Sequence, residues 1–102
     1  MIKHDIVISD QAKLDAGNHV AFLAEKSDEA AIELQTRLIT AIRTLYEMPM
    51  RYPFFNEPYI PPNKYHKMFV EKYYLVLYQV KDDHVFVDMI LDARQELPWL
   101  LR

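Results

Sequence analysis

The stretch Tyr65–Gln95 decides the fold and reads YHKMFVEKYYLVLYQVKDDHVFVDMILDARQ. Three apolar-rich runs are separated by two short charged segments, Glu71-Lys72 and Lys81-Asp82-Asp83. Within the runs, residues alternate between two faces, which is the period of a β-strand. The pattern predicts a three-stranded antiparallel meander with one face to bury and one face free.

The residues before this stretch supply the layer that buries one face. Lys3–Ile8 is rich in β-branched residues and predicts a first strand. Ser9 and Ser27 each precede an amphipathic pattern and are typical N-caps, so two helices are expected. The second helix is expected to end near Met48, because Pro49 disfavours helical geometry in the residue before it. Gly17 costs about 1 kcal/mol relative to alanine and predicts an irregularity in the first helix.

These elements predict a single α+β domain over residues 1–102. Its antiparallel sheet contains the N-terminal strand and the C-terminal meander, with a two-helix hairpin packed on one face. The free face is then expected to present His66, Lys67 and Arg94 to a ligand. The tail Gln95–Arg102 carries an apolar Trp-Leu-Leu segment and is expected to close against the core.

Residues 49–62 form a segment rich in proline and aromatic residues between the helices and the meander. Prolines fix the backbone, so a stiff loop with aromatic anchors is expected. Large aromatic side chains are usually buried, which favours packing of these rings onto the domain. The alternative is a binding loop that stacks on a base or grips a partner.

Composition excludes several classes of protein. The chain has no cysteine, so disulfides and thiolate catalysis are excluded and a reducing cytoplasmic location is expected. The N-terminus MIKHDIVIS is not expected to act as a signal peptide, and no apolar run is long enough to cross a membrane. A net charge of −3 argues against nucleic-acid binding by bulk electrostatics. The four histidines lack the spacing of a metal site, and no metal or cofactor is expected.

The order of strand, helical hairpin, proline loop and meander resembles the RelE/ParE superfamily of toxins from bacterial type II toxin–antitoxin systems. The resemblance is carried by HVAFLAEKSDEAAIELQTRLITAIRTLYEMPMRYP and YYLVLYQVKDDHVFVDMILDARQ. It implies a cytoplasmic toxin that is neutralised by a cognate antitoxin. The RelE branch cleaves mRNA on the ribosome, whereas the ParE branch inhibits DNA gyrase.

The resemblance also suggests site residues. Arg94 stands where RelE-type toxins keep an arginine, and His66 and Lys67 stand near a strand lysine of that branch, so these three are the catalytic candidates. The ribonuclease reaction needs a general base and cations that stabilise charge on the phosphate. Met68 and Leu75, however, replace a second lysine and an arginine of the branch, which weakens the ribonuclease hypothesis.

Several alternatives stay open at the level of sequence. Arg94 is equally well explained by a plain surface ion pair with Asp92 or Glu96, and His66 by a solvent-facing position without a catalytic role. The apolar residues at the end of the second helix are explained by the core or by an antitoxin groove that includes Tyr46, Met48 and Met50. Whether the target is the ribosome or gyrase is undecided. A non-toxic interaction module of the same fold is a third hypothesis.

Overall fold

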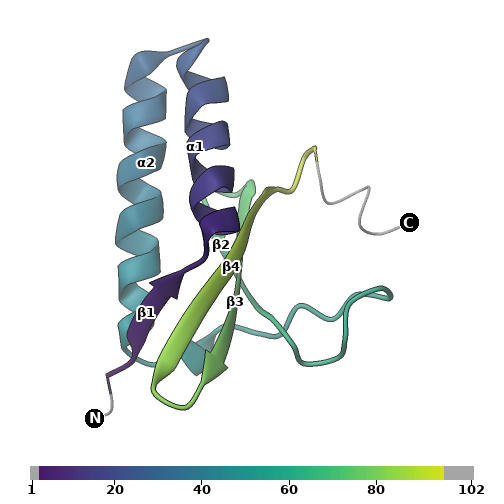
Figure 1. Ribbon diagram of the computed structural model, residues 1–102. Helices are drawn as coiled ribbons and strands as arrows, with labels where there is room; N and C mark the ends of the chain where they lie inside the picture. The colour runs from purple at the N-terminus through teal and green to yellow at the C-terminus, as the bar shows by residue number, and fades with distance from the viewer. Residues whose placement is uncertain (1–2, 96–102) are drawn as a thin grey trace.

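The computed structural model describes residues 3–95. Figure 1 shows an α+β architecture in which two helices stand beside a four-stranded sheet, and this confirms the predicted fold class. The elements are β1 (Asp5–Ile8), α1 (Asp10–Ala24), α2 (Asp28–Arg43), the 3-10 helices η1 (Thr44–Tyr46) and η2 (Pro49–Arg51), β2 (His66–Val70), β3 (Tyr74–Lys81) and β4 (His84–Asp92).

The strand order in the sheet is β1-β4-β3-β2. The three strands of the meander are antiparallel, as predicted, whereas β1 pairs with β4 in the parallel direction. A β-bulge between Leu77 and Tyr78 shifts the β3–β4 register, so that Leu77 pairs with Met89 and Tyr78 with Val87.

The helices begin as their capping residues predict. The Ser9 hydroxyl accepts a hydrogen bond from the Ala12 amide, and the Ser27 hydroxyl accepts one from the Ala30 amide. α1 continues through Gly17, so the expected irregularity is wrong: contacts of α1 with α2 and β4 offset the cost of one glycine. α2 ends at Arg43, before the predicted end, and the chain tightens into η1 before Met48 takes up a left-handed conformation (φ 51°) ahead of Pro49.

One face of the sheet is covered by the two helices, and we call it the helix-covered face. Its main core joins helix residues to alternate residues of the strands. Its buried members are Ala12, Leu34, Leu38, Ile42, Leu45, Met68, Val70, Tyr74, Val76, Tyr78, Val85, Val87 and Ile90.

The opposite face was expected to be free, and this expectation is wrong. Leu75 and Leu77 on this face are fully buried because the proline-rich segment folds over them. Phe55 lies at the centre of this second cluster, and Ile60 and Tyr65 pack against it. We call it the loop-covered face. The aromatic segment is therefore a third layer of the domain.

Beyond the end of β1, side chains of α1 bind the backbone of β4. β1 stops at Ile8, opposite Val87, and leaves the next part of β4 without a neighbouring strand. The Asp15 carboxylate accepts a hydrogen bond from the Ile90 amide at 3.0 Å, and His19 Nε2 lies 2.8 Å from the Ile90 carbonyl oxygen. These side chains satisfy backbone groups that a longer β1 would otherwise bind.

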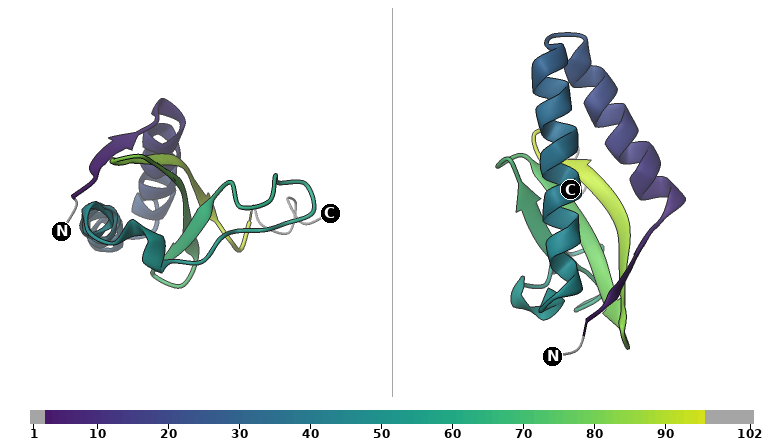
Figure 2. Two further views of the ribbon diagram at one scale, coloured as in Figure 1. Left: turned by 90° about the horizontal axis from the view of Figure 1, so that it is seen from below. Right: turned by 90° about the vertical axis from the view of Figure 1, so that its left-hand side faces the viewer.

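The two helices meet at their hairpin turn and diverge toward β1, as the right-hand view of Figure 2 shows. Residues of α1, α2 and β1 line a groove in this region. The predicted closing segment Gln95–Arg102 lies outside the described residues, apart from Gln95.

Candidate functional site

His66 begins β2 and is the most deeply placed of the three catalytic candidates. Its side chain is buried, so the solvent-facing position expected for it is wrong. The ring is stacked between Phe54 and Tyr78, with centroids 4.3 and 5.2 Å away. His66 Nδ1 lies 2.8 Å from the carbonyl oxygen of Tyr52. This environment holds the imidazole inside an aromatic stack, with one ring nitrogen already bound to backbone.

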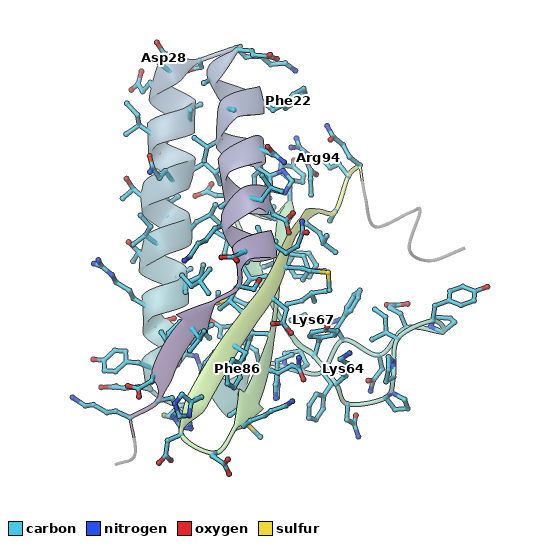
Figure 3. All side chains as sticks on the ribbon, in the orientation of Figure 1. Phe22, Asp28, Lys64, Lys67, Phe86 and Arg94 are labelled. Carbon is cyan, nitrogen blue, oxygen red and sulfur yellow. The ribbon has the colours of Figure 1, made fainter. Side chains whose placement is uncertain are left out.

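Lys67 points to the other face of the sheet, because successive strand residues alternate in direction. Its amide donates a hydrogen bond to the Pro53 carbonyl oxygen at 2.9 Å. The ammonium lies 5.9 Å from the centroid of the Phe55 ring, on the loop-covered face. Lys67 is therefore a partly exposed cation at the root of the proline-rich loop (Figure 3).

Arg94 follows β4 and is bound to Asp92. Its Nε and Nη2 donate to the two carboxylate oxygens of Asp92 at 3.2 and 3.1 Å, and its amide donates to Oδ1 at 2.9 Å. The Asp92 side chain is 3% exposed and that of Arg94 is 51% exposed. The guanidinium also lies 4.3 Å from the centroid of the Tyr73 ring. An ion pair with Asp92 was one of the interpretations of the sequence and is confirmed, but its expected surface position is wrong for Asp92, whose carboxylate is buried.

The charges of this pair reinforce each other. Burial alone would raise the pKa of the Asp92 carboxyl, but hydrogen bonds from the Arg94 side chain and amide outweigh burial and lower that pKa. In turn, the hydrogen bond to Asp92 raises the pKa of Arg94. Arg94 is thus a cation whose charge is already balanced by a buried carboxylate.

The three candidates do not meet at one site. His66 pairs with Tyr78 on β3, whereas Asp92, which holds Arg94, pairs with Tyr74. Four residues of β3 at about 3.3 Å each separate these positions by roughly 13 Å. Lys67 is near His66 in sequence but lies on the other face. Leu75, which stands in place of an arginine, is buried beneath the loop.

A groove between α1, α2 and β1 has a volume of about 560 Å³. Its walls are mainly apolar and include Ile8, Ala16, Val20 and Ile39. Lys13 and Arg43 contribute positive charge at the lining. A Cβ atom placed on Gly17 would meet no other atom within 4 Å, so the groove is open at this residue. Below, we call this opening the helix groove.

Sequence reasoning missed the helix groove, because it assigned the apolar stripes of both helices to the core. A usable signal was present in α2, where Ile32 and Ile39 fall outside the buried stripe and are exposed. Tyr46, Met48 and Met50 are also exposed at the end of the helical hairpin, so the core interpretation of these three residues is wrong.

Comparison with known proteins identifies the family. Residues 6–97 match the model of the family described as "ParE toxin of type II toxin-antitoxin system, parDE". The chain belongs to this ParE family. A solved structure titled "Chromosomal ParDE TA system from P. aeruginosa" is similar in fold, with a TM-score of 0.70 over 88% of this chain and 96% of that one, at 12% sequence identity. No curated protein matches the chain.

The chain is thus a ParE-family toxin in which the three predicted catalytic residues lie at separate positions. Within residues 3–95 there is also no group of three or more His, Asp or Glu side chains arranged to hold a metal ion. No helix in this range is long and apolar enough to cross a membrane. The features that stand out are two surfaces, the helix groove and the proline-rich loop.

Proposed function

We propose that this ParE-family chain arrests bacterial growth as a protein inhibitor of DNA gyrase, without a chemical step of its own. The observation that carries the proposal is the dispersal of His66, Lys67 and Arg94 over both faces and two ends of the sheet. A toxin that acts by binding its target needs a complementary surface, whereas a ribonuclease needs its catalytic side chains close together at one site.

The chemistry of RNA cleavage explains why the dispersal matters. A general base has to reach the 2′-hydroxyl within hydrogen-bond distance, and cations have to lie where charge develops on the phosphate. His66 is enclosed by Phe54 and Tyr78, and the charge of Arg94 is balanced by Asp92. A ribosome-dependent ribonuclease would have to open the aromatic stack and break the ion pair before the reaction.

The helix groove is the surface that we assign to the cognate antitoxin. Its lining is mostly apolar and its cations are Lys13 and Arg43, so an amphipathic helix with acidic residues at its margins fits it. The similar structure from P. aeruginosa is titled as a ParDE system, which supports an antitoxin as the partner. Tyr46, Met48 and Met50 extend the exposed apolar surface beyond the end of α2.

The test is a supercoiling assay with purified bacterial gyrase, paired with an assay for mRNA cleavage on translating ribosomes. We expect inhibition of supercoiling and intact mRNA, and we expect Arg94→Ala that remains folded to inhibit as well as the wild type. In cells, thymidine incorporation should then fall before methionine incorporation. Cleavage of mRNA that Arg94→Ala abolishes, with normal supercoiling, would reject gyrase and restore the ribonuclease hypothesis.

A further inference from the structure

The segment Asn56–Asn63 forms a closed loop that projects from the domain on the side away from β1 and α2 (Figures 1 and 2). Its two ends are held together by a pair of asparagine contacts. Asn56 Nδ2 donates to Asn63 Oδ1 at 3.1 Å, and the Asn63 amide donates to Asn56 Oδ1 at 2.8 Å. Directly below, the Phe55 amide donates to the Tyr65 carbonyl oxygen at 2.7 Å. The loop therefore has a fixed neck.

Two proline-initiated turns shape the loop between its ends. The Ile60 amide bonds to the Glu57 carbonyl oxygen at 3.0 Å, with Pro58 next in the chain after Glu57. The Lys64 amide bonds to the Pro61 carbonyl oxygen at 3.3 Å, around Pro62 and a left-handed Asn63 (φ 59°). Proline suits the second position of both turns, and asparagine suits the left-handed third position of the second turn. The loop is thus ordered before any partner arrives, which lowers the entropic cost of binding.

Two neighbouring side chains of the loop differ in exposure: one packs against the domain, and the other faces solvent. Ile60 packs against the cluster around Phe55 and fastens the loop to the sheet. Its neighbour Tyr59 is 73% exposed, more than any other large apolar or aromatic side chain in residues 3–95. A tyrosine supplies a large contact area with few rotatable bonds, and such residues dominate binding energy at protein interfaces.

The root of the loop carries two cations without an ion-pair partner in residues 3–95. Lys64 and Lys67 lie where the loop leaves the sheet (Figure 3). Their ammonium groups lie 5.2 Å from the Tyr65 ring centroid and 5.9 Å from the Phe55 ring centroid. Neither belongs to the ion pairs found within residues 3–95, which involve Arg37, His84 and Arg94 as cations. An acidic surface on a partner would complement these two lysines.

We infer that this loop is the element with which the toxin grips its target protein. Tyr59 enters an apolar pocket of the target, and carboxylates at the rim of that pocket pair with Lys64 and Lys67. A protein fits better than nucleic acid, because the chain has a net charge of −3 and the loop offers a single exposed ring rather than a series for stacking. The inference rests on the proposed function only in that the chain acts by binding a target.

The experiment compares the full chain with Tyr59→Ala, Tyr59→Phe and Phe22→Ala. Phe22 is a matched control, since it is an exposed aromatic residue at the hairpin end of α1, far from the loop (Figure 3). Each variant is induced in bacteria at equal protein levels and scored for growth arrest, then purified for the supercoiling assay with gyrase. We expect Tyr59→Ala to reduce potency at least tenfold, and on the order of 30-fold if Tyr59 is a hot spot. Tyr59→Phe and Phe22→Ala should stay close to the wild type.

The outcomes are separable. Full growth arrest by folded Tyr59→Ala overturns the role of the loop, whatever the target. Arrest by the wild type without inhibition of supercoiling rejects gyrase, and the loop is then judged by the growth data alone. A wild-type chain that does not arrest growth rejects both proposals. Tight binding of the wild type to a 30-nucleotide DNA, weakened in Lys64→Gln/Lys67→Gln, would replace the protein partner by nucleic acid.

Discussion

The two faces of the sheet are buried by layers of different kinds. On β3, the neighbouring residues Leu77 and Tyr78 point to opposite faces and are both fully buried. Tyr78 is covered by a layer built from helices with regular hydrogen bonds. Leu77 is covered by a segment without strands or α-helices, which prolines, turns and the asparagine contacts hold in place. An irregular segment can therefore bury a strand as completely as a helix does.

The two faces also differ in polarity. Both buried polar side chains in residues 3–95, His66 and Asp92, lie on the helix-covered face, near its two ends. The Tyr78 hydroxyl on the same face donates to the Pro49 carbonyl oxygen at 2.5 Å. The cluster under the loop contains only apolar side chains and the ring of Tyr65. Buried polar groups therefore help to fix the helix-covered face. The cluster on the loop-covered face is held by apolar packing, and the segment above it by hydrogen bonds at its ends.

The largest expected effect tests whether the loop is a structural layer. We expect Leu77→Ala to lower the free energy of unfolding by about 2–5 kcal/mol, because a buried leucine leaves a cavity when truncated. Leu45→Ala on the helix-covered face is the matched control with the same expected loss, since both leucines are fully buried. Urea denaturation measures both. A loss under about 1 kcal/mol for Leu77→Ala alone would mean that the loop collapses freely and is not a packed layer.

The next effect concerns the polar end of the helix-covered face. Arg94→Ala takes the guanidinium away from a buried carboxylate and should cost about 1–3 kcal/mol at pH 7. In the wild type the pKa of Asp92 is lowered, so its contribution is present above the unfolded pKa and is lost as pH falls through the folded pKa. In the variant the side-chain bonds and charge of Arg94 are lost while its amide bond remains, so the pKa of Asp92 should be higher than in the wild type. The stability difference should therefore narrow as pH falls from 7 toward 3.

Urea denaturation across this pH range measures the difference. Arg37→Ala is the control, because Arg37 pairs with the exposed Glu33 and should give a smaller change. A stability loss that does not vary with pH would show that Arg94 acts through its stacking on Tyr73 rather than through its charge.

The sequence predicted the regular elements of the domain. Period-2 and helical patterns, with Ser9 and Ser27 as caps, were enough for the meander and the two helices. The parallel pairing of β1 with β4 was not predicted, because the residues of a strand do not record the direction of its neighbour. Packing of aromatic rings from the proline-rich segment onto the domain was predicted, and the burial of Phe55 confirms it, whereas Tyr59 is exposed. The face that this segment covers was not predicted, since a segment of prolines and aromatic residues has no period from which that face can be read.

The candidate site was predicted less well than the fold, although part of the physical reason can be read from the sequence. His66 and Lys67 are adjacent in a strand, so alternation alone places them on opposite faces. Asp92, two residues before Arg94, provided the signal for the ion pair. The burial of His66 depends on Phe54 and Tyr52 of the proline-rich segment, and no local sequence pattern indicates such contacts.

A smaller effect is expected where the helix layer is incomplete. Gly17→Ala should stabilise the chain by up to about 1 kcal/mol, because alanine favours the helix and its Cβ meets no atom within 4 Å. If the helix groove receives an antitoxin helix, the same methyl group should weaken antitoxin binding. Urea denaturation and a binding titration with the antitoxin measure the two effects. The reverse change at exposed Ala21, Ala21→Gly, should destabilise α1 and leave binding intact. A Gly17→Ala variant that binds antitoxin like the wild type would argue against close packing over Gly17.

The smallest expected effect lies in the turn that joins β2 to β3. Glu71 and Lys72 both have positive φ, 56° and 70°, in a chain whose only glycine is in α1. A left-handed conformation costs roughly 1–2 kcal/mol for a residue with a Cβ, and the ion pair of Glu71 with Arg37 offsets part of that cost for Glu71 only. Lys72→Gly should therefore raise the unfolding free energy by about 0.5–1 kcal/mol, after the greater freedom of glycine in the unfolded chain is counted. Lys81→Gly, at a strand position without positive φ, should instead lower it. If both glycine variants lower the unfolding free energy equally, the backbone strain at Lys72 is too small to affect stability. The β2–β3 turn is then as relaxed as the regular elements of the helix-covered face.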